Sequence, residues 1–409
     1  MNSITIKSKI VTDYRIEYEY TIMGEWKKYF TNETFYAEYS RPIKDINNSI
    51  AIIPVLGTVL PISWVFDAEI IVDEIDEMFY NSIPEFKKGY INMFPQLNFR
   101  GRLVADKIIK NENSGSKSAA LFSGGVDAFA TLFTQIGKNP DLITIWGADI
   151  AAENDDGWNV VKNHRDKVLD LLRLAGITIK SSFRKSINEI ELSAYSLKNA
   201  NDNWWHGFHH GIGMFALTAP IAYINGYSEL YVASSFTAEY KGQYTAASDP
   251  TIDNYVKFCG CNVVHDGYEF NRQDKIHNIC KYSNEHNIKI PLRVCWESTG
   301  GSNCCRCEKC CRTMLGIYAE GHNPVNFGFN FWNDSLSLLR KTLSKSSSFG
   351  DMRYGGIQKR MRDNYSKKEI IPSLRWFYTT DVNVLAIRFK IRKKIKNIII
   401  KILKKAKVI

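Results

Sequence analysis

The sequence of 409 residues lacks several features that mark particular classes of protein. It contains no run of about 18 apolar residues, the length that a membrane-spanning helix requires. Its start, Met1–Lys7, lacks the apolar core of a secretory signal, so we expect a cytoplasmic protein. All nine cysteines lie between Cys259 and Cys311, whereas a disulfide framework spreads its cysteines along the chain. With 44% hydrophobic and 13% aromatic residues, the composition is typical of a globular protein.

Acidic residues are absent from the segment 382–409, which contains ten Lys or Arg residues. The formal net charge of +10 is therefore a property of this segment, and the rest of the chain is neutral. Apolar residues recur there at helical spacing, namely at Ile387, Ile391, Ile395, Ile398, Ile399, Ile402 and Ala406. We expect a basic amphipathic helix that suits an anionic membrane surface, at the inner face of the membrane, or a protein partner. Few aromatic residues interleave for base stacking, so specific nucleic acid binding is not expected.

Residues 118–128 form a short apolar strand, a Ser123-Gly124-Gly125 turn and the start of an apolar helix. Two glycines allow backbone N–H groups to converge on one point, and a helix start adds unpaired amides and a positive dipole end. This pattern predicts a phosphate cradle, with Ser123 as a hydroxyl donor. Asp127 can cap the helix or meet a magnesium ion. The alternative is a plain tight turn.

The cysteines are densest near residues 295–311. Cys295, Cys304, Cys307 and Cys310 are separated by eight, two and two intervening residues. Two successive Cys-x-x-Cys turns bring three thiolates together, and the Gly-Gly pair in the longer gap folds the fourth onto them. Four thiolates satisfy tetrahedral zinc and leave no open position, so the predicted site is structural. A register that uses the spare Cys305 or Cys311 is the alternative.

These two motifs in this order resemble those of the PP-loop ATP pyrophosphatases, and most closely the 7-cyano-7-deazaguanine synthase family. The signature Ser-Gly-Gly-x-Asp is present, although Ala128 replaces the Ser or Thr that usually follows. The resemblance covers about residues 118–320. It implies that ATP with Mg²⁺ binds at Leu121, Phe122, Ser123, Gly124, Gly125, Val126 and Asp127, that Ser123 and Asp127 are catalytic, and that Zn²⁺ binds at the four named cysteines.

The alternation of strands and helices after Ser118 favours an α/β fold with a parallel sheet. The expected elements are strand 118–121, helix 126–137, strand 142–146, helix 158–176, strand 177–180, helix 211–224 and strand 229–233. Before them, residues 50–56 and similar pieces predict strands, with a helix or two near residues 74–94. The acidic run 73–77 is interpreted as a solvated helix face.

The predicted organisation therefore has four parts. They are a mostly β N-terminal extension at 1–112, a Rossmann-like PP-loop ATP-binding domain at 118–325 with its zinc-binding element at 295–311, a helical region at 326–381 and the basic helix at 382–409. The linker 110–117 is rich in polar residues and marks the first boundary.

Other polar residues are weaker candidates. His206 and His210 lie beside tryptophans, and aromatic packing at a helix start is favoured over a metal site because no carboxylate or cysteine is seen at ligand spacing. Asp249, Arg272 and Lys275 can orient an acidic or amide substrate, or serve as a cap and surface charges.

The expected activity is adenylation of a substrate carboxylate or amide oxygen, then nitrogen transfer with release of AMP and pyrophosphate. The substrate would be a small molecule or the product of a dedicated biosynthetic gene cluster, and a homo-oligomer is compatible with the sequence. One alternative is a nucleotide-binding subunit without turnover in a larger assembly. Another is sulfur transfer to tRNA, which needs a reactive cysteine or an iron–sulfur cluster.

Overall fold

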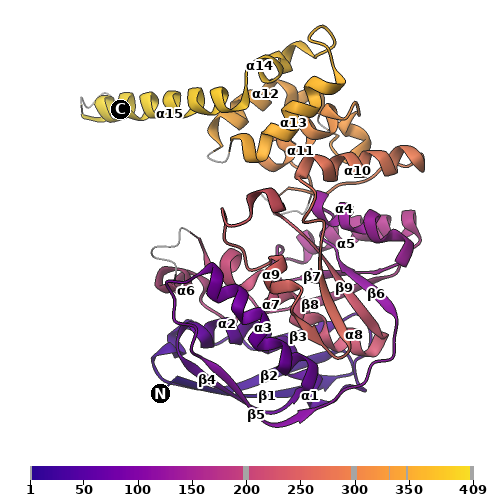
Figure 1. Cartoon of the computed structure of the whole chain (residues 1–409), viewed down its shortest axis with the longest axis vertical. Coiled ribbons are helices and arrows are strands. Elements are labelled where there is room, and N and C mark those ends of the chain that lie inside the picture. The colour runs from indigo at the N-terminus through magenta and orange to yellow at the C-terminus, as the bar shows by residue number, and fades with distance from the viewer. Residues whose placement is uncertain (1, 197–201, 296–301, 331, 347–348, 406–409) are drawn as a thin grey trace. The chain divides into compact units, whose positions relative to one another are not determined.

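A computed structural model of the chain describes residues 2–196, 202–295, 302–330, 332–346 and 349–405. The chain divides into two compact units (Figure 1). Unit 1 consists of Met1–Ser123 and Thr134–Glu269, and unit 2 of Gly124–Phe133 and Phe270–Ile409. The chain therefore passes from unit 1 into unit 2 directly after Ser123.

Unit 1 contains an eleven-stranded sheet with the strand order β10-β11-β9-β6-β7-β8-β3-β2-β1-β4-β5. The strands are β1 (Asn2–Thr12), β2 (Arg15–Met23), β3 (Phe35–Tyr39), β4 (Ala68–Asp76), β5 (Arg102–Ile109), β6 (Lys117–Leu121), β7 (Asp141–Trp146), β8 (Gly176–Ser181), β9 (Tyr227–Ala233), β10 (Lys257–Phe258) and β11 (Cys261–Asp266). The run β11-β9-β6-β7-β8 is parallel throughout. The structure thus confirms an α/β protein with a mostly parallel sheet.

Strand β6 lies where the strand order reverses. From β6 the chain adds β7 and β8 on one side, and later adds β9 and β11 on the other side. In open sheets of this kind the loops that leave the carboxyl ends of strands at such a reversal form ligand sites. The loop that leaves β6 begins with Phe122 and Ser123. The four strands predicted between residues 118 and 233 are all confirmed, and each of them contains buried residues.

Residues 1–112 contribute β1–β5 to the same sheet, joined through an antiparallel pairing of β3 with β8. The prediction of a strand at residues 50–56 is wrong, since this stretch lies in α1 (Asn48–Ala51) and α2 (Ile53–Val65). The side chain of Asn47 caps α1, and Pro54 fits the first turn of α2. Nearly every residue of α2 is buried, so its sequence shows no helical period.

The interpretation of residues 73–77 as a solvated helix face is also wrong. Most of the run ends β4, and α3 (Glu77–Met93) begins only at its last residue. Asp76 is fully buried and caps α3 by accepting a hydrogen bond of 2.9 Å from the N–H of Phe79. It also accepts one of 3.0 Å from the N–H of Cys259. The carboxylate is therefore a structural acceptor and not a surface charge.

The remaining helices of unit 1 include α5 (Asp155–Leu172), α6 (Glu189–Ser196), α7 (Ile212–Phe215), α8 (Ala219–Asn225) and α9 (Pro250–Asp253). Helix α5 ends before the predicted residue 176, because Arg173 adopts a left-handed conformation with φ 55°. The predicted helix 211–224 is divided into α7 and α8 by a short 3₁₀ turn. Helix α2 packs closely on α7, and a Cβ at Gly57 would lie 2.6 Å from the carbonyl oxygen of Ile212.

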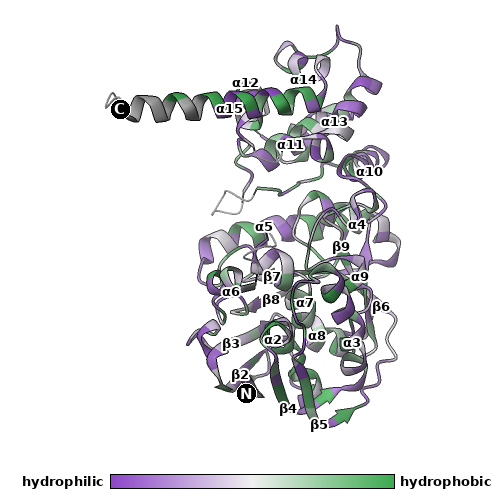
Figure 2. Ribbon diagram, turned by 60° about the vertical axis from the view of Figure 1, so that its left-hand side comes forward, coloured by the Kyte–Doolittle hydropathy of each residue, from purple (hydrophilic) through white to green (hydrophobic). Residues whose placement is uncertain are grey.

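Unit 2 is helical. Its elements are the first part of α4 (Val126–Gln135), α10 (Arg272–Glu285), α11 (Glu308–Ala319), α12 (Trp332–Lys345), α13 (Asp351–Asn364), α14 (Arg375–Thr379) and α15 (Val382–Lys405). The ring of Phe133 at the end of this part of α4 stacks on Tyr282 of α10 at 3.9 Å. Hydrophobic and hydrophilic residues both occur along α15 (Figure 2). Within the described residues, no helix combines the length and apolarity needed to cross a membrane.

Candidate functional site

The loop after β6 has the strand–turn–helix form that the sequence predicts. The N–H of Phe122 donates to the carbonyl of Ile143 at 2.8 Å, which continues the pairing of β6 with β7. Gly124 has φ 77°, a conformation that L side chains rarely adopt, so glycine favours this turn. Helix α4 begins at once, and the carbonyl of Gly125 accepts from the N–H of Phe129 at 3.0 Å. The first N–H groups of such a helix have no partner within it.

Asp127 lies in the first turn of α4 and forms ion pairs with two residues of α10. Its carboxylate is 3.2 Å from Nη1 of Arg272 and 3.6 Å from Nζ of Lys275. The capping box formed by Asn271 and Asp274 starts α10 so that Arg272 and Lys275 lie one turn apart. Three residues that the sequence indicates separately thus meet within unit 2. The side chain of Lys275 is only 3% exposed, so its assignment as a surface charge does not hold.

Two further cations, on α11, affect Asp127. Burial alone would raise the pKa of this carboxyl, but the positive charges of Lys275, Arg272, Lys309 and Arg312 outweigh it and hold the pKa below its ordinary value. Asp127 is therefore ionised at neutral pH. An ionised carboxylate with exposed surface can act as an oxygen ligand for magnesium if its ion pairs open.

We use "cationic cluster" for Arg272, Lys275, Lys309, Arg312 and Arg353 with the acids Asp127 and Glu308. Glu308 is held by Arg312, whose Nε lies 3.3 Å from Oε1, and by a hydrogen bond of 2.5 Å from the hydroxyl of Tyr354. In the part of the chain that the structure describes, this group contains five cations and two carboxylates. Two of the cations, Lys275 and Arg312, are buried.

Several buried polar atoms of the cationic cluster have no hydrogen-bond partner among the described residues. They are Nε of Arg272, Nε of Arg312 and Oε2 of Glu308. Arg312 lies near Glu308 but without the geometry of a hydrogen bond through Nε. Burial, together with the charge of Arg312, lowers the pKa of Arg272 to about 10. Buried donors without acceptors cost free energy, which an anionic ligand would recover.

The four predicted cysteines meet in unit 2. The sulfurs of Cys295, Cys304, Cys307 and Cys310 all lie within 4.8 Å of one another, and those of Cys295 and Cys307 are 3.8 Å apart. Four sulfurs at 2.3 Å from a tetrahedral zinc ion would be separated by about 3.8 Å. The cluster can therefore hold a metal ion. The glycines of the predicted Gly-Gly hairpin, residues 300 and 301, lie outside the described residues.

Backbone amides donate hydrogen bonds to two of these sulfurs. The N–H of Cys307 donates to the sulfur of Cys304 at 3.2 Å, and the N–H of Cys310 donates to the sulfur of Cys307 at 3.5 Å. Hydrogen bonds from Cys310 lower the pKa of Cys307 to about 5, whereas burial raises the pKa of Cys304 to about 11. Cys305 and Cys311 are buried and do not belong to the group, which favours the predicted register over its alternative.

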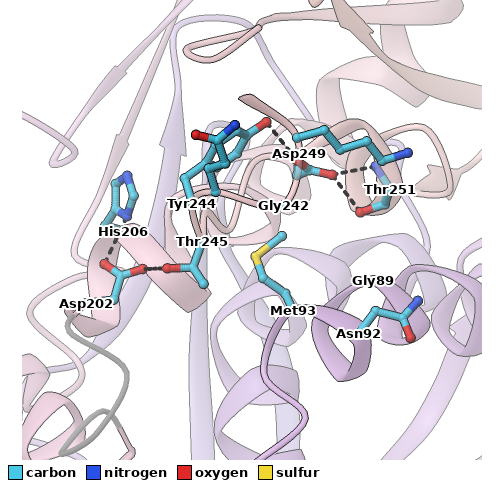
Figure 3. Close-up of a pocket in the computed structure, with 12 residues that line it drawn as sticks. Gly89, Asn92, Met93, Asp202, His206, Gly242, Tyr244, Thr245, Asp249 and Thr251 are labelled. Atoms are coloured by element: carbon cyan, nitrogen blue, oxygen red, sulfur yellow. Dashed lines mark hydrogen bonds and ion pairs between the residues drawn. The ribbon is translucent and has the colours of Figure 1, made fainter. Parts of the chain in front are cut away.

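Unit 1 contains a pocket of about 760 Å³ (Figure 3). It is lined by Gly89, Asn92, Met93, Asp202, His206, Lys241, Gly242, Gln243, Tyr244, Thr245, Asp249 and Thr251. Nδ1 of His206 lies 2.9 Å from the carboxylate of Asp202, which also accepts a hydrogen bond of 2.5 Å from the hydroxyl of Thr245. Asp202 stands four residues before His206, so the expectation that no carboxylate accompanies this histidine is wrong. The spacing of four residues between Asp202 and His206, about one helical turn, is the feature of the sequence that could have predicted this pair.

The other residues near this pocket have structural partners. Asp249 caps α9 through the N–H of Thr251 at 2.9 Å and lies 3.3 Å from the hydroxyl of Tyr244, so the cap is the role that the structure shows. His209 is fully buried, its Nε2 lies 2.9 Å from Oγ1 of Thr58, and burial lowers its pKa to about 3. His210 packs edge-on against Trp205. Aromatic packing at this helix start is thus confirmed.

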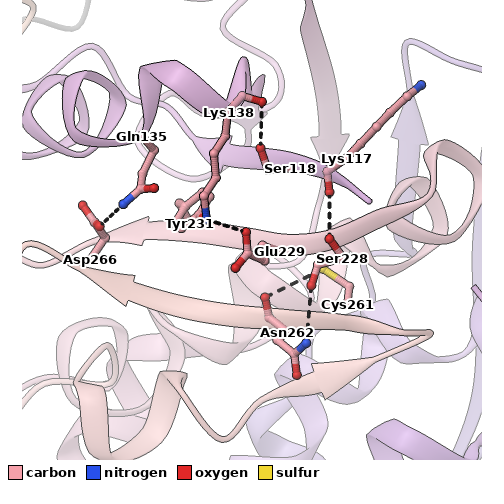
Figure 4. Close-up of polar contacts among 10 residues, drawn as sticks. All are labelled: Lys117, Ser118, Gln135, Lys138, Ser228, Glu229, Tyr231, Cys261, Asn262 and Asp266. Carbon is pink, nitrogen blue, oxygen red and sulfur yellow. Dashed lines mark hydrogen bonds and ion pairs between the residues drawn. The ribbon is translucent and has the colours of Figure 1, made fainter. Parts of the chain in front are cut away.

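A second group of polar contacts in unit 1 joins the end of α4 to the sheet (Figure 4). Nζ of Lys138 is 2.8 Å from Oε2 of Glu229 on β9, and this carboxylate also accepts from the hydroxyl of Tyr231 at 2.6 Å. Gln135 donates to Asp266 on β11 at 2.7 Å. The contacts of Lys138 and Gln135 link the chain at the end of α4 to β9 and β11, which is a structural role.

The described residues thus offer a cysteine cluster that can hold a metal ion and a cationic cluster in unit 2, and a pocket in unit 1. Asp127 and the four cysteines were predicted from the sequence, whereas Lys309, Arg312, Arg353 and Asp202 were not. A signal was available for Lys309 and Arg312, which follow Cys307 at spacings that place them on α11 beside the metal ligands. No family model, curated protein or solved structure matches the chain.

Proposed function

We propose that the protein is a PP-loop ATP-dependent enzyme that forms C–N bonds. It would adenylate a carboxylate or amide oxygen of its substrate and then transfer nitrogen, in the manner of the 7-cyano-7-deazaguanine synthases that its motifs resemble. The observation that carries the proposal is the cationic cluster around Asp127. Within the described residues it brings five cations together with two carboxylates, in the unit that begins with the Gly124 turn.

Each part of the cluster has a role in this chemistry. Arg272 and Lys275 would bind phosphate oxygens, and the buried Nε atoms of Arg272 and Arg312 would gain acceptors. Asp127, freed from its cations by the phosphates, would hold the magnesium ion. The amides at the start of α4 would contact the same anion. Catalysis would then consist of positioning and charge neutralisation, without a nucleophilic side chain.

The reaction balances without an oxidant. The substrate oxygen forms a bond to the α phosphorus while the bond to the β phosphate oxygen breaks, and pyrophosphate leaves with the negative charge. A nitrogen nucleophile then forms a bond to the activated carbon, the carbon–oxygen bond breaks, and AMP leaves. The cations of the cluster would stabilise the charge that develops on the pyrophosphate.

The four-cysteine cluster has a separate, structural role in this proposal. Its ligands are all thiolates, so a zinc ion held there has no open position for a substrate. Two of the ligands, Cys307 and Cys310, are at the start of α11, the helix that carries Lys309 and Arg312. The metal would therefore fix the helix that presents part of the cationic cluster.

The test uses full-length, zinc-loaded protein with magnesium and ATP labelled at the α phosphate, incubated with and without a small-metabolite extract. Extract-dependent AMP that is lost in Asp127→Ala would support the proposal. The matched control is Asp156→Ala, because Asp156 is also in the first turn of a helix but is exposed. ATP that binds in the wild type but is not turned over with extracts from several growth conditions would favour the nucleotide-binding subunit instead.

A further inference from the structure

Helix α15 is anchored in unit 2 by the residues of its first two turns. Val382, Leu385, Ala386 and Phe389 are buried. The ring of Phe389 lies 5.1 Å from that of Phe349 and 6.2 Å from that of Trp376. These contacts use one face of the helix, so its other face is open to a different partner.

The other face of α15 exposes large aliphatic side chains. Ile387, Ile391, Ile395 and Ile399 follow one another at intervals of four residues and are 49–57% exposed. Residues at this spacing lie on one side of a helix, and the exposed Val384 one turn earlier extends the stripe. We call these five residues the isoleucine stripe. A continuous stripe of half-exposed aliphatic residues differs from the single exposed apolar residues that are normal on a protein surface.

Cations flank the isoleucine stripe. The helix contains no acidic residue, and Arg388, Lys390, Arg392, Lys393 and Lys394 are all exposed. The surface that covers the stripe must therefore accept both aliphatic side chains and a high density of positive charge. Nucleic acid offers negative charge but no apolar layer at its surface, whereas an anionic bilayer offers both.

We propose that α15 docks on the surface of a membrane that contains anionic lipids. The helix lies in the interface, with the isoleucine stripe among the acyl chains and the lysines and arginines at the headgroups. The lysines and arginines that recur along the helix prevent it from crossing the bilayer. This inference is independent of the proposed enzymatic function, since it concerns where unit 2 is held and not what it catalyses.

The experiment is co-sedimentation of the full-length, zinc-loaded protein with phosphatidylcholine vesicles, with and without phosphatidylglycerol. We expect binding only to the anionic vesicles, and we expect it to weaken as salt is raised. Lys393→Gln with Lys394→Gln should lower the partition coefficient about fivefold for each charge removed. Unchanged thermal unfolding and zinc content would show that the variants are folded.

The apolar contribution is tested by Ile391→Gln with Ile395→Gln, which keeps the charge. We expect the partition coefficient to fall about tenfold or more. The matched control is Ile190→Gln. This isoleucine is 82% exposed but lies on α6 and not on α15. Vesicle binding that survives loss of the two isoleucines would overturn the proposal, because the attraction to the anionic lipid would then be electrostatic alone. No vesicle binding, with self-association that the isoleucine variant loses, would overturn it in favour of a protein partner.

Discussion

The pocket of unit 1 and the cationic cluster of unit 2 differ in how far the described residues satisfy the hydrogen bonds of their polar groups. The pocket is large, about 760 Å³, yet the carboxylates of Asp202 and Asp249 on its wall are satisfied by neighbouring hydroxyl, amide and imidazole groups. The cluster leaves buried guanidinium nitrogens of Arg272 and Arg312 without acceptors. A protein fills most of its buried hydrogen bonds by itself, so an unpaired donor within a group of cations is a place where an anion can bind.

The volume of a cavity and the presence of unsatisfied polar groups are therefore separate properties. A cavity lined by satisfied groups can admit solvent, whereas a buried donor without an acceptor raises the free energy of the folded state until a ligand supplies one. We therefore propose that the phosphates of a nucleotide bind at the cationic cluster of unit 2 rather than in the pocket. The predictions below test this assignment.

The largest effect is expected at the cysteine cluster. Cys307→Ser removes a zinc ligand and the side chain that caps α11, and zinc binding contributes on the order of 10 kcal/mol in structural sites. We expect the variant to lose most of its zinc and to unfold at least about 10 °C lower than the wild type. Elemental analysis and thermal unfolding would measure both changes.

Cys311→Ser is the matched control for that variant, because Cys311 is buried on the same helix but outside the cluster. It should retain about one zinc per chain. The Cys307→Ser protein should also no longer be stabilised by pyrophosphate, the anion used below to test the cationic cluster, since α11 carries Lys309 and Arg312. A zinc content that stays unchanged in Cys307→Ser would contradict the assignment of the ligands.

The next effect concerns anions at the cationic cluster. Pyrophosphate at about 100 times its dissociation constant should stabilise the wild type by about 2.7 kcal/mol. Arg312→Ala should weaken pyrophosphate binding about tenfold, because a charge-assisted hydrogen bond is lost. Thermal unfolding over a pyrophosphate titration measures both quantities. Arg375→Ala in α14, an exposed arginine of the same unit, should leave the titration unchanged.

The third effect is a dependence of the free energy of unfolding on pH, caused by a buried histidine of unit 1. His209 in unit 1 is buried in the neutral form, with a pKa lowered to about 3 from 6.5. Below pH 6.5 the unfolded chain binds a proton that the folded chain does not, so stability falls as the pH falls. Between pH 7 and pH 5.5 the loss should be about 1.2 kcal/mol. Urea unfolding at the two pH values measures it, and His209→Gln should show a smaller loss.

Much of this organisation follows from local sequence. The strand–turn–helix around Gly124 and the strands β7, β8 and β9 are confirmed, because short apolar runs bounded by turns favour strands. The proximity of the four cysteines is also confirmed, because ligand spacing constrains the backbone directly. In each case residues that act together are close along the chain.

Features that depend on distant contacts were not predictable. Helix α2 is buried on all sides, so its sequence has no amphipathic period to separate it from a strand. The pairing of Asp127 with Arg272 joins residues 145 positions apart, and only the fold of unit 2 brings them together. Tyr354, which donates to Glu308 across 46 positions, is another such contact.

The smallest effect is expected in the pocket and tests the comparison from its other side. In Asp202→Asn the side chain keeps one acceptor, so either the hydroxyl of Thr245 or Nδ1 of His206 loses its partner. We expect a loss of about 1 kcal/mol in the free energy of unfolding, measured in urea, whereas the exposed control Asp156→Asn should change it by less than about 0.5 kcal/mol. The stabilisation by pyrophosphate should equal that of the wild type, because this carboxylate serves unit 1 alone. A response to pyrophosphate that falls as far as in Arg312→Ala would mean that the pocket takes part in anion binding, and satisfied hydrogen bonds would then no longer distinguish the two regions.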